Sequence, residues 1–175
     1  LLAALSLCLL DPAPNPPDST APPTPYISAG SGGHFYFKMV PDKDKSGTGT
    51  VYKVTRGETD EAVWSVSGWY AFETYLSDDG RYLVRMGNLA RGSEPSDHDL
   101  AVAFYDRGEL LAEYSTKALI KDPSRIARSL SHYLYRDHEL PIGFIRTHTD
   151  GVWPLHWFHF VTGDHVHYTF DRRTG

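Results

Sequence analysis

Cysteine is almost absent from this sequence, because Cys8 is the only one among 175 residues. A single thiol excludes a disulfide framework within the chain, a zinc site built from several cysteines and a Cys-x-x-Cys redox pair. An excess of positive charge is also lacking, since 17 lysines and arginines stand against 22 aspartates and glutamates, for a formal net charge of -5. The chain is therefore a poor candidate for binding nucleic acid or an anionic membrane surface.

Hydrophobic runs long enough to cross a membrane are missing as well. The apolar residues 1–10 (LLAALSLCLL) would extend about 15 Å as a helix, against a hydrocarbon core of roughly 30 Å. Their length suits the apolar middle of a secretory signal peptide, and we interpret them as its remnant. The alternative is a short buried helix in a cytosolic protein.

The residues around Cys8 bear on the destination of the chain. Leu5-Ser6-Leu7-Cys8 resembles the box in which a bacterial signal ends at a lipidated cysteine, although Leu7 stands where a small residue is usual. We expect an exported protein that is periplasmic, envelope-associated or secreted. A membrane contact is expected only through a lipid anchor at Cys8, and a buried or cleaved-off cysteine is the simpler interpretation.

The rest of the chain holds enough apolar material for one folded domain. Hydrophobic residues make up 41% of the sequence and aromatic residues 13%, which argues against disorder over most of its length. Residues 11–25 contain seven of the twelve prolines, a composition that favours extended conformations and predicts a linker. The single β-rich domain is therefore expected over residues 26–175.

Short aromatic and β-branched runs alternate with Gly and Asp turns in this domain, a pattern typical of antiparallel strands. The pattern repeats, with units at about 26–67 and 69–115 and a fainter third unit at about 141–175. Asp79-Gly80 and Arg107-Gly108 are expected to supply the positive φ angles that tight hairpin turns need. The strands are expected near residues 34–40, 49–55 and 62–67, near 69–76, 81–86, 100–105 and 109–114, and near 142–147, 152–161 and 165–170.

The repeat has a resemblance to a known family. Residues 75–84 (YLSDDGRYLV) resemble the Ser-Pro-Asp-Gly turn and following strand of bacterial β-propeller-type repeat proteins, with Asp78 in the place of the usual Pro. Residues 104–108 (FYDRG) are similar to the later hairpin of such blades. The resemblance implies an all-β antiparallel meander of about three propeller-like units. Closed propellers generally have at least four blades, so an open or partial propeller, an open twisted sheet and a meander closed into a barrel or sandwich all stay open.

An insertion between the second and third units, at about 118–140, is predicted to contain one short helix. Asp122 can cap it, and Pro123 fits its first position. Three apolar residues then recur at a spacing of four and would cover an edge or face of a sheet. They are Ile126, Leu130 and Leu134.

Histidines gather near the end of the chain, where five of nine fall between residues 148 and 167. Residues 153–171 read as a hairpin around Thr162-Gly163-Asp164. With an even loop length, even positions of the first strand pair with odd positions of the second. That register places His156, Phe158 and Phe160 on the face of His165 and His167. The opposite, core-like face would carry Leu155, Trp157, His159, Val161, Val166, Tyr168 and Phe170.

Three imidazoles on one sheet face could bind zinc, because three histidines and a water form a known catalytic zinc site. His156, His165 and His167 are the candidate ligands. The simpler interpretation is a solvated sheet face, and we favour no metal or other cofactor. His159 is expected to be a core histidine bonded through its ring nitrogens.

Other patterns have simple structural explanations. Arg81 and Arg85 share a strand face with Leu83 and could bind an anion, but a solvent-facing charged row explains them too. The acidic loop at 94–99 could hold calcium, although a solvated loop is simpler. Aromatic residues crowd positions 64–82, where packing is a more general explanation than a peptide or glycan groove.

We therefore expect a non-enzymatic binding or scaffold module of the bacterial envelope, whose ligand is an unknown protein, peptide or glycan. No Gly-x-Ser-x-Gly nucleophile elbow occurs in the sequence. One alternative is a metal-dependent hydrolase that uses the three histidines. The other is a fragment of a larger β-propeller, which the missing initial Met and the final half-turn at 170–175 favour.

Overall fold

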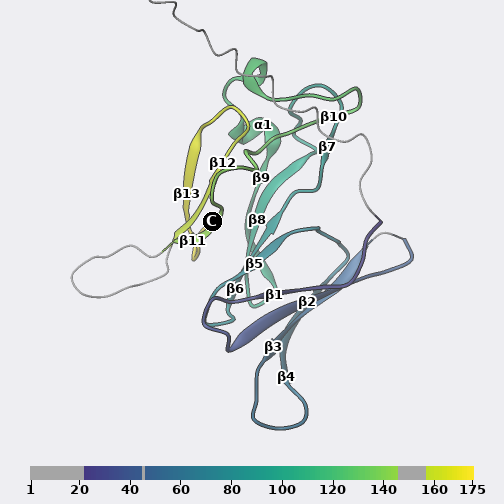
Figure 1. Ribbon diagram of the computed structural model, residues 1–175, viewed down its shortest axis with the longest axis vertical. Coiled ribbons are helices and arrows are strands. Elements are labelled where there is room, and N and C mark those ends of the chain that lie inside the picture. Colours follow the sequence, from purple (N-terminus) through teal and green to yellow (C-terminus); the bar gives the residue numbers. More distant parts are fainter. Residues whose placement is uncertain (1–21, 45, 146–156) are drawn as a thin grey trace, which may run out of the picture.

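Three antiparallel meanders follow one another in the computed structural model, which describes residues 22–44, 46–145 and 157–175 (Figure 1). Sheet 1 contains β1 (Tyr26–Ala29), β2 (Phe35–Pro41), β3 (Gly47–Lys53) and β4 (Glu61–Ser67). Sheet 2 contains β5 (Thr74–Leu76), β6 (Tyr82–Met86), β8 (Leu100–Asp106) and β9 (Glu109–Ser115). Sheet 3 contains β11 (Gly143–Ile145), β12 (Trp157–Val161) and β13 (His167–Asp171).

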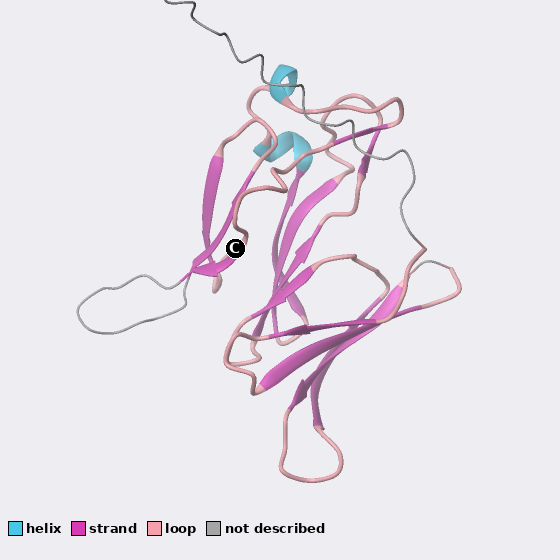
Figure 2. Cartoon of the chain, in the orientation of Figure 1, coloured by secondary structure: helices cyan, strands magenta, loops and turns pink. Residues whose placement is uncertain are grey.

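The predicted all-β, antiparallel class is confirmed (Figure 2). Within each sheet the strands pair in chain order, and the described residues form no closed barrel. Most expected strands agree with the observed ones to within two residues, but the strand expected at 69–76 is only β5, and β1 was not expected. The segments expected at 142–147 and 152–161 lie partly outside the described residues. The signal-like residues 1–10 with Cys8, and residues 11–21 of the linker, also lie outside them.

The central strands β6 and β8 of sheet 2 are buried on both faces, because sheet 1 packs on one side and sheet 3 on the other. Successive residues of a strand point to opposite faces. Leu83, Ala103 and Tyr105 join the core shared with sheet 1. Val84, Met86, Val102 and Phe104 join the core shared with sheet 3. The apolar run of β8 follows from this arrangement, since a strand covered on both faces needs apolar residues at odd and even positions alike.

The core between sheets 1 and 2 depends on a close approach at Gly49. Phe37, Met39 and Val51 are fully buried there. The Phe37 ring lies directly over Gly49, where an added Cβ atom would overlap the ring. A side chain at residue 49 is therefore excluded by packing.

The core between sheets 2 and 3 is aromatic. Phe158 and Phe160 of β12 are buried, and Phe170 of β13 joins them. The Phe104 ring of sheet 2 meets Phe158 edge-on at a centroid distance of 6.0 Å and lies 5.0 Å from the Phe170 ring. Such edge-to-face and tilted contacts are favourable geometries for aromatic rings.

The insertion contains a short helix, but not where the sequence pattern placed it. The four-residue α1 (Thr116–Leu119) directly follows β9, and the segment capped by Asp122 is only a 3-10 turn, η1 (Pro123–Arg125). The Asp122 side chain does accept a hydrogen bond from Ser124 N at 3.1 Å, as expected of a cap. None of the helices in the described part of the chain is long and apolar enough to span a membrane.

The helix expected beyond Asp122 is wrong because the chain folds back on itself there. Leu134 N donates to Ala127 O, and Ser129 N donates to His132 O, so Leu130 lies at a tip and is 97% exposed. The Ser129 hydroxyl accepts a hydrogen bond from the backbone N–H of His132. Local bonds of this kind from serine side chains compete with the backbone bonds of a helix. The returning strand β10 (His132–Tyr133) pairs with β7 (Ala90–Arg91) and buries Tyr133.

Asp164 ties the insertion to the β12–β13 turn. This carboxylate is buried and accepts hydrogen bonds from Lys121 N at 2.7 Å, from Asp122 N at 2.9 Å and from the Thr162 hydroxyl. Burial alone would raise the pKa of Asp164, but these hydrogen bonds outweigh it and hold the pKa below its ordinary value.

Replacing Gly49 by Ala should destabilise the fold, because the new methyl group cannot fit beside the buried Phe37 ring. We expect a loss of roughly 1–3 kcal/mol in the free energy of unfolding, as for overpacked cores generally. Chemical denaturation measures it. Gly57→Ala is the matched control, since an added Cβ there meets only Thr55 Oγ1 at 3.5 Å. Equal stability of the two variants would contradict the close packing at residue 49.

Replacing Asp164 by Asn should lower the free energy of unfolding by about 1–3 kcal/mol at pH 7, because the backbone donors of Lys121 and Asp122 lose a charged acceptor. A carboxylate with a lowered pKa in the folded state stabilises fully above about pH 4, and that stability is lost as the pH falls through the folded pKa. The difference between the two proteins should therefore shrink below pH 4. Denaturation at several pH values measures this difference, with exposed Glu58→Gln as control. A difference in the free energy of unfolding that stays constant with pH would contradict the role of the Asp164 carboxylate.

Candidate functional site

The register of the β12–β13 hairpin corrects the predicted distribution of histidines. Phe158 pairs with Phe170 and Val161 with His167, so positions of like parity are partners. The reason is a three-residue turn, Gly163 to His165, in which His165 N donates to Thr162 O and His165 has a φ of 63°. An odd loop of this kind, with a left-handed last residue, is a common hairpin type.

With this register, each residue of β12 lies on the face of the hairpin opposite to the one predicted. Phe158 and Phe160 lie in the core, together with Tyr168 and Phe170. His159 belongs to the outer face with His167, and the two rings lie 5.5 Å apart. The expectation that His159 is a core histidine of the aromatic face is therefore wrong.

The three candidate zinc ligands lie in different settings. His165 lies in the turn, with its Nδ1 atom 3.3 Å from Asp137 Oδ2. His167 lies on the outer face of β13, and His156 lies outside the described residues. Across residues 22–44, 46–145 and 157–175, no group of three or more His, Cys, Asp or Glu side chains is placed to hold a metal. The zinc hypothesis stays a prediction.

Other sequence candidates are engaged in packing. The Arg85 guanidinium lies 4.5 Å from the centre of the Trp69 ring and Leu83 on the same face is fully buried, whereas the Arg81 side chain is 42% exposed. In the acidic loop, Asp97 pairs with Lys117 at 2.7 Å, and Asp99 accepts the Tyr133 hydroxyl at 2.9 Å. In the aromatic cluster Tyr70 and Tyr82 are buried and pack in the core, whereas Phe72 is 41% exposed.

A hollow of about 440 Å³ lies where one end of sheet 1 meets the two tight turns of sheet 2. Sheet 1 contributes Phe35, Lys53, Glu61, Val63 and Trp64. The β5–β6 turn contributes Asp79, Gly80 and Arg81, and the β8–β9 turn contributes Arg107. The lining therefore comes from both Asp-Gly and Arg-Gly turns of the sequence repeat.

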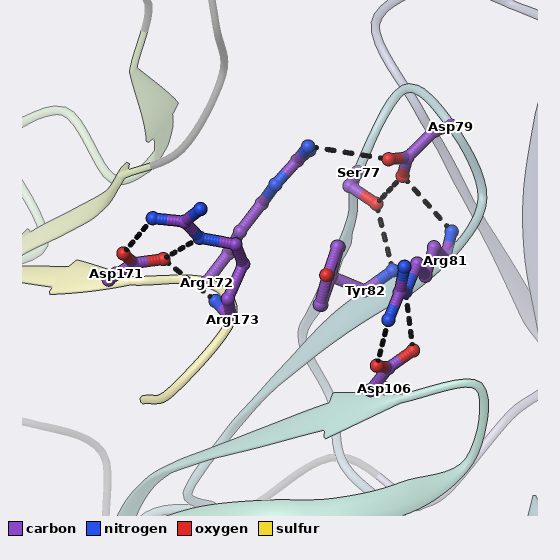
Figure 3. A network of polar contacts seen from close by, with 8 residues as sticks. All are labelled: Ser77, Asp79, Arg81, Tyr82, Asp106, Asp171, Arg172 and Arg173. Atoms are coloured by element: carbon purple, nitrogen blue, oxygen red, sulfur yellow. Dashed lines mark hydrogen bonds and ion pairs between the residues drawn. The ribbon is translucent and has the colours of Figure 1, made fainter.

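The Asp79-Gly80 turn is held firmly (Figure 3). The Ser77 hydroxyl donates to Asp79 Oδ1 at 2.6 Å and accepts from Tyr82 N at 2.9 Å. Gly80 has a φ of 68°, and its carbonyl oxygen accepts the Trp64 indole N–H at 2.8 Å. This last bond connects the turn of sheet 2 to the edge strand of sheet 1.

Arg81 is fixed by a two-pronged ion pair. Its Nε and Nη2 atoms donate to the two carboxylate oxygens of Asp106 at 2.8 and 2.6 Å (Figure 3). The hydrogen bond from Arg81 holds the pKa of Asp106 below its ordinary value. The guanidinium groups of Arg81 and Arg172 both lie over the Tyr82 ring, at 4.9 and 4.8 Å, and Arg172 Nη2 is 3.3 Å from Asp79 Oδ2.

Lys53 and Arg107 are the cations of the hollow that have no such partner. Both are exposed, and neither side chain makes a hydrogen bond or ion pair with another described residue. Arg107 has a φ of 49°, followed by 90° at Gly108, as a two-residue turn of type I′ requires. The left-handed conformation costs a residue other than glycine roughly 1–2 kcal/mol.

The sequence reading found part of this site. Arg81 and Trp64 were among the residues considered, and Arg107-Gly108 was correctly predicted as a turn with positive φ. Lys53 and Arg107 were missed as binding candidates. The available signal was an arginine at a turn position that prefers Asn, Asp or Gly.

Comparisons with known proteins do not identify the site. No family model, curated protein or solved structure matches the chain. The resemblance to β-propeller repeats therefore stays a prediction, and the chemistry of the hollow follows from its own geometry.

Proposed function

We propose that this protein is an exported, non-enzymatic binding or scaffold module made of propeller-like units, and that its ligand binds in the hollow between sheets 1 and 2. The observation that carries the proposal is the pair of cations Lys53 and Arg107, which form no ion pair with a described residue, beside the half-buried rings of Phe35 and Trp64. A small ligand with an anionic group and an apolar face complements this combination.

The form of the hollow supports binding. Its volume lies within the roughly 300–1,000 Å³ typical of small-molecule sites, which combine apolar walls with a few placed polar groups. The Arg81–Asp106 pair and the Ser77–Asp79 contacts fix the turn before any ligand arrives. Fixed donors reduce the ordering cost of association.

The propeller-like part of the proposal is supported by the stacking of the sheets. Sheet 2 is a four-stranded meander with a sheet packed on each face, and sheet 1 repeats its four-strand order. Repeated sheets packed face to face are the building principle of propellers. Export is supported by the signal-like residues 1–10 and the proline-rich linker alone, with membrane contact limited to an anchor at Cys8.

The function is tested by thermal unfolding with a panel of small anionic and neutral sugars, peptides and carboxylates. A ligand at 100 times its Kd stabilises the folded state by about 2.7 kcal/mol, which raises the Tm of a domain this size by about 5–10 °C. We expect an anionic compound to raise the Tm of the wild type and of exposed Arg125→Gln equally, and to raise the Tm of Arg107→Gln by only about half as much, because a tenfold weaker Kd leaves about 1.4 kcal/mol of stabilisation.

Two results would contradict the proposal. One is that no anionic compound shifts the Tm in an Arg107-dependent manner. The other is metal-dependent hydrolysis of panel compounds that is lost in His167→Ala, which would favour the hydrolase alternative.

A further inference from the structure

We infer that the hollow binds an acidic saccharide, with the carboxylate of a hexuronic acid unit held between Lys53 and Arg107. The inference rests on the proposed function and specifies its ligand. It follows from the balance of charge in the lining, from the mixture of donors and acceptors, and from the apolar residues beside them.

The charge of the lining favours a ligand that places one carboxylate in the hollow. Among the cations, Arg81 is neutralised by Asp106, and among the carboxylates, Asp79 is paired with Arg172. What remains is the positive charge of Lys53 and Arg107 against the negative charge of Glu61. One carboxylate balances this surplus, whereas a dianionic phosphate, or several carboxylates held in the hollow together, would overcompensate it next to Glu61 and Asp79.

The polar groups of the lining include acceptors as well as donors. Glu61 is exposed, and the Asp79 side chain is 46% exposed, so both carboxylates can accept hydrogen bonds from a ligand. A uronic acid carries hydroxyl donors together with its carboxylate and can use both halves of the lining. An aspartate or glutamate side chain of a peptide would satisfy Lys53 and Arg107 but offer no hydroxyl group to Glu61 or Asp79.

Apolar residues complete the match to a sugar. Phe35, Val63 and Trp64 line the same hollow, and Val63 is 47% exposed. A pyranose ring has an apolar C–H face that packs on aromatic and aliphatic side chains, while its hydroxyls remain at the polar side. The Trp64 ring is held by its indole bond to Gly80 O and therefore forms a rigid part of the wall.

The test is calorimetric titration of the whole chain with trigalacturonate and with its methyl-esterified form, which has the same rings without the charge. We expect the acid to bind and the ester to bind at least about tenfold more weakly, because charge-assisted hydrogen bonds are lost. Arg107→Gln and Lys53→Gln should each weaken binding of the acid by about tenfold, and Arg125→Gln should leave it unchanged.

Glu61→Ala separates a sugar from a peptide ligand. Loss of this acceptor should weaken trigalacturonate binding several-fold, whereas an oligoglutamate peptide would bind more tightly once the like charge is removed. Equal binding of acid and ester, or no binding of trigalacturonate, overturns the inference. If oligoglutamate binds instead and Arg107→Gln abolishes it, the binding function stands and only the ligand class is wrong.

Discussion

The burial of the central strands of sheet 2 on both faces is the constraint on which the rest of the described structure depends. β8 sends Ala103 and Tyr105 into the core with sheet 1, and Val102 and Phe104 into the core with sheet 3. One strand thus fixes the positions of both neighbouring sheets. The hollow exists because sheet 1, held in this way, brings Trp64 within hydrogen-bond distance of the Asp79-Gly80 turn. At the other interface, Asp164 ties the insertion to sheet 3.

Features that depend on local chemistry were predictable from the sequence. Asp79-Gly80 and Arg107-Gly108 mark tight turns because few residues tolerate positive φ, and the strands beside them followed from apolar patterning. The register of the β12–β13 hairpin was not predictable, because it depends on whether His165 belongs to the turn or to the strand. The spacing of Ile126 and Leu130 suggested a helix, but serine side chains and the burial of Tyr133 favoured a reversal of the chain.

The hollow could not be predicted as a site because its residues are brought together only by the packing of two sheets. Lys53 and Trp64 come from sheet 1, whereas Arg81 and Arg107 come from separate turns of sheet 2. Arg81 is committed to Asp106, which leaves Arg107 as the exposed guanidinium beside it. Arg107 adopts a left-handed conformation that is unfavourable for a residue other than glycine, and in the proposed site its side chain would bind the anionic group of the ligand.

The most direct test of a ligand in this hollow is an NMR titration of the nitrogen-15-labelled protein with trigalacturonate. The indole N–H of Trp64 reports on the part of the lining that belongs to sheet 1, and the Nε–H of Arg107 reports on the part that belongs to sheet 2. If the ligand binds in the hollow, both signals should shift together and saturate with the same Kd. Shifts that instead gather on the outer face of sheet 3, around His159 and His167, would contradict it.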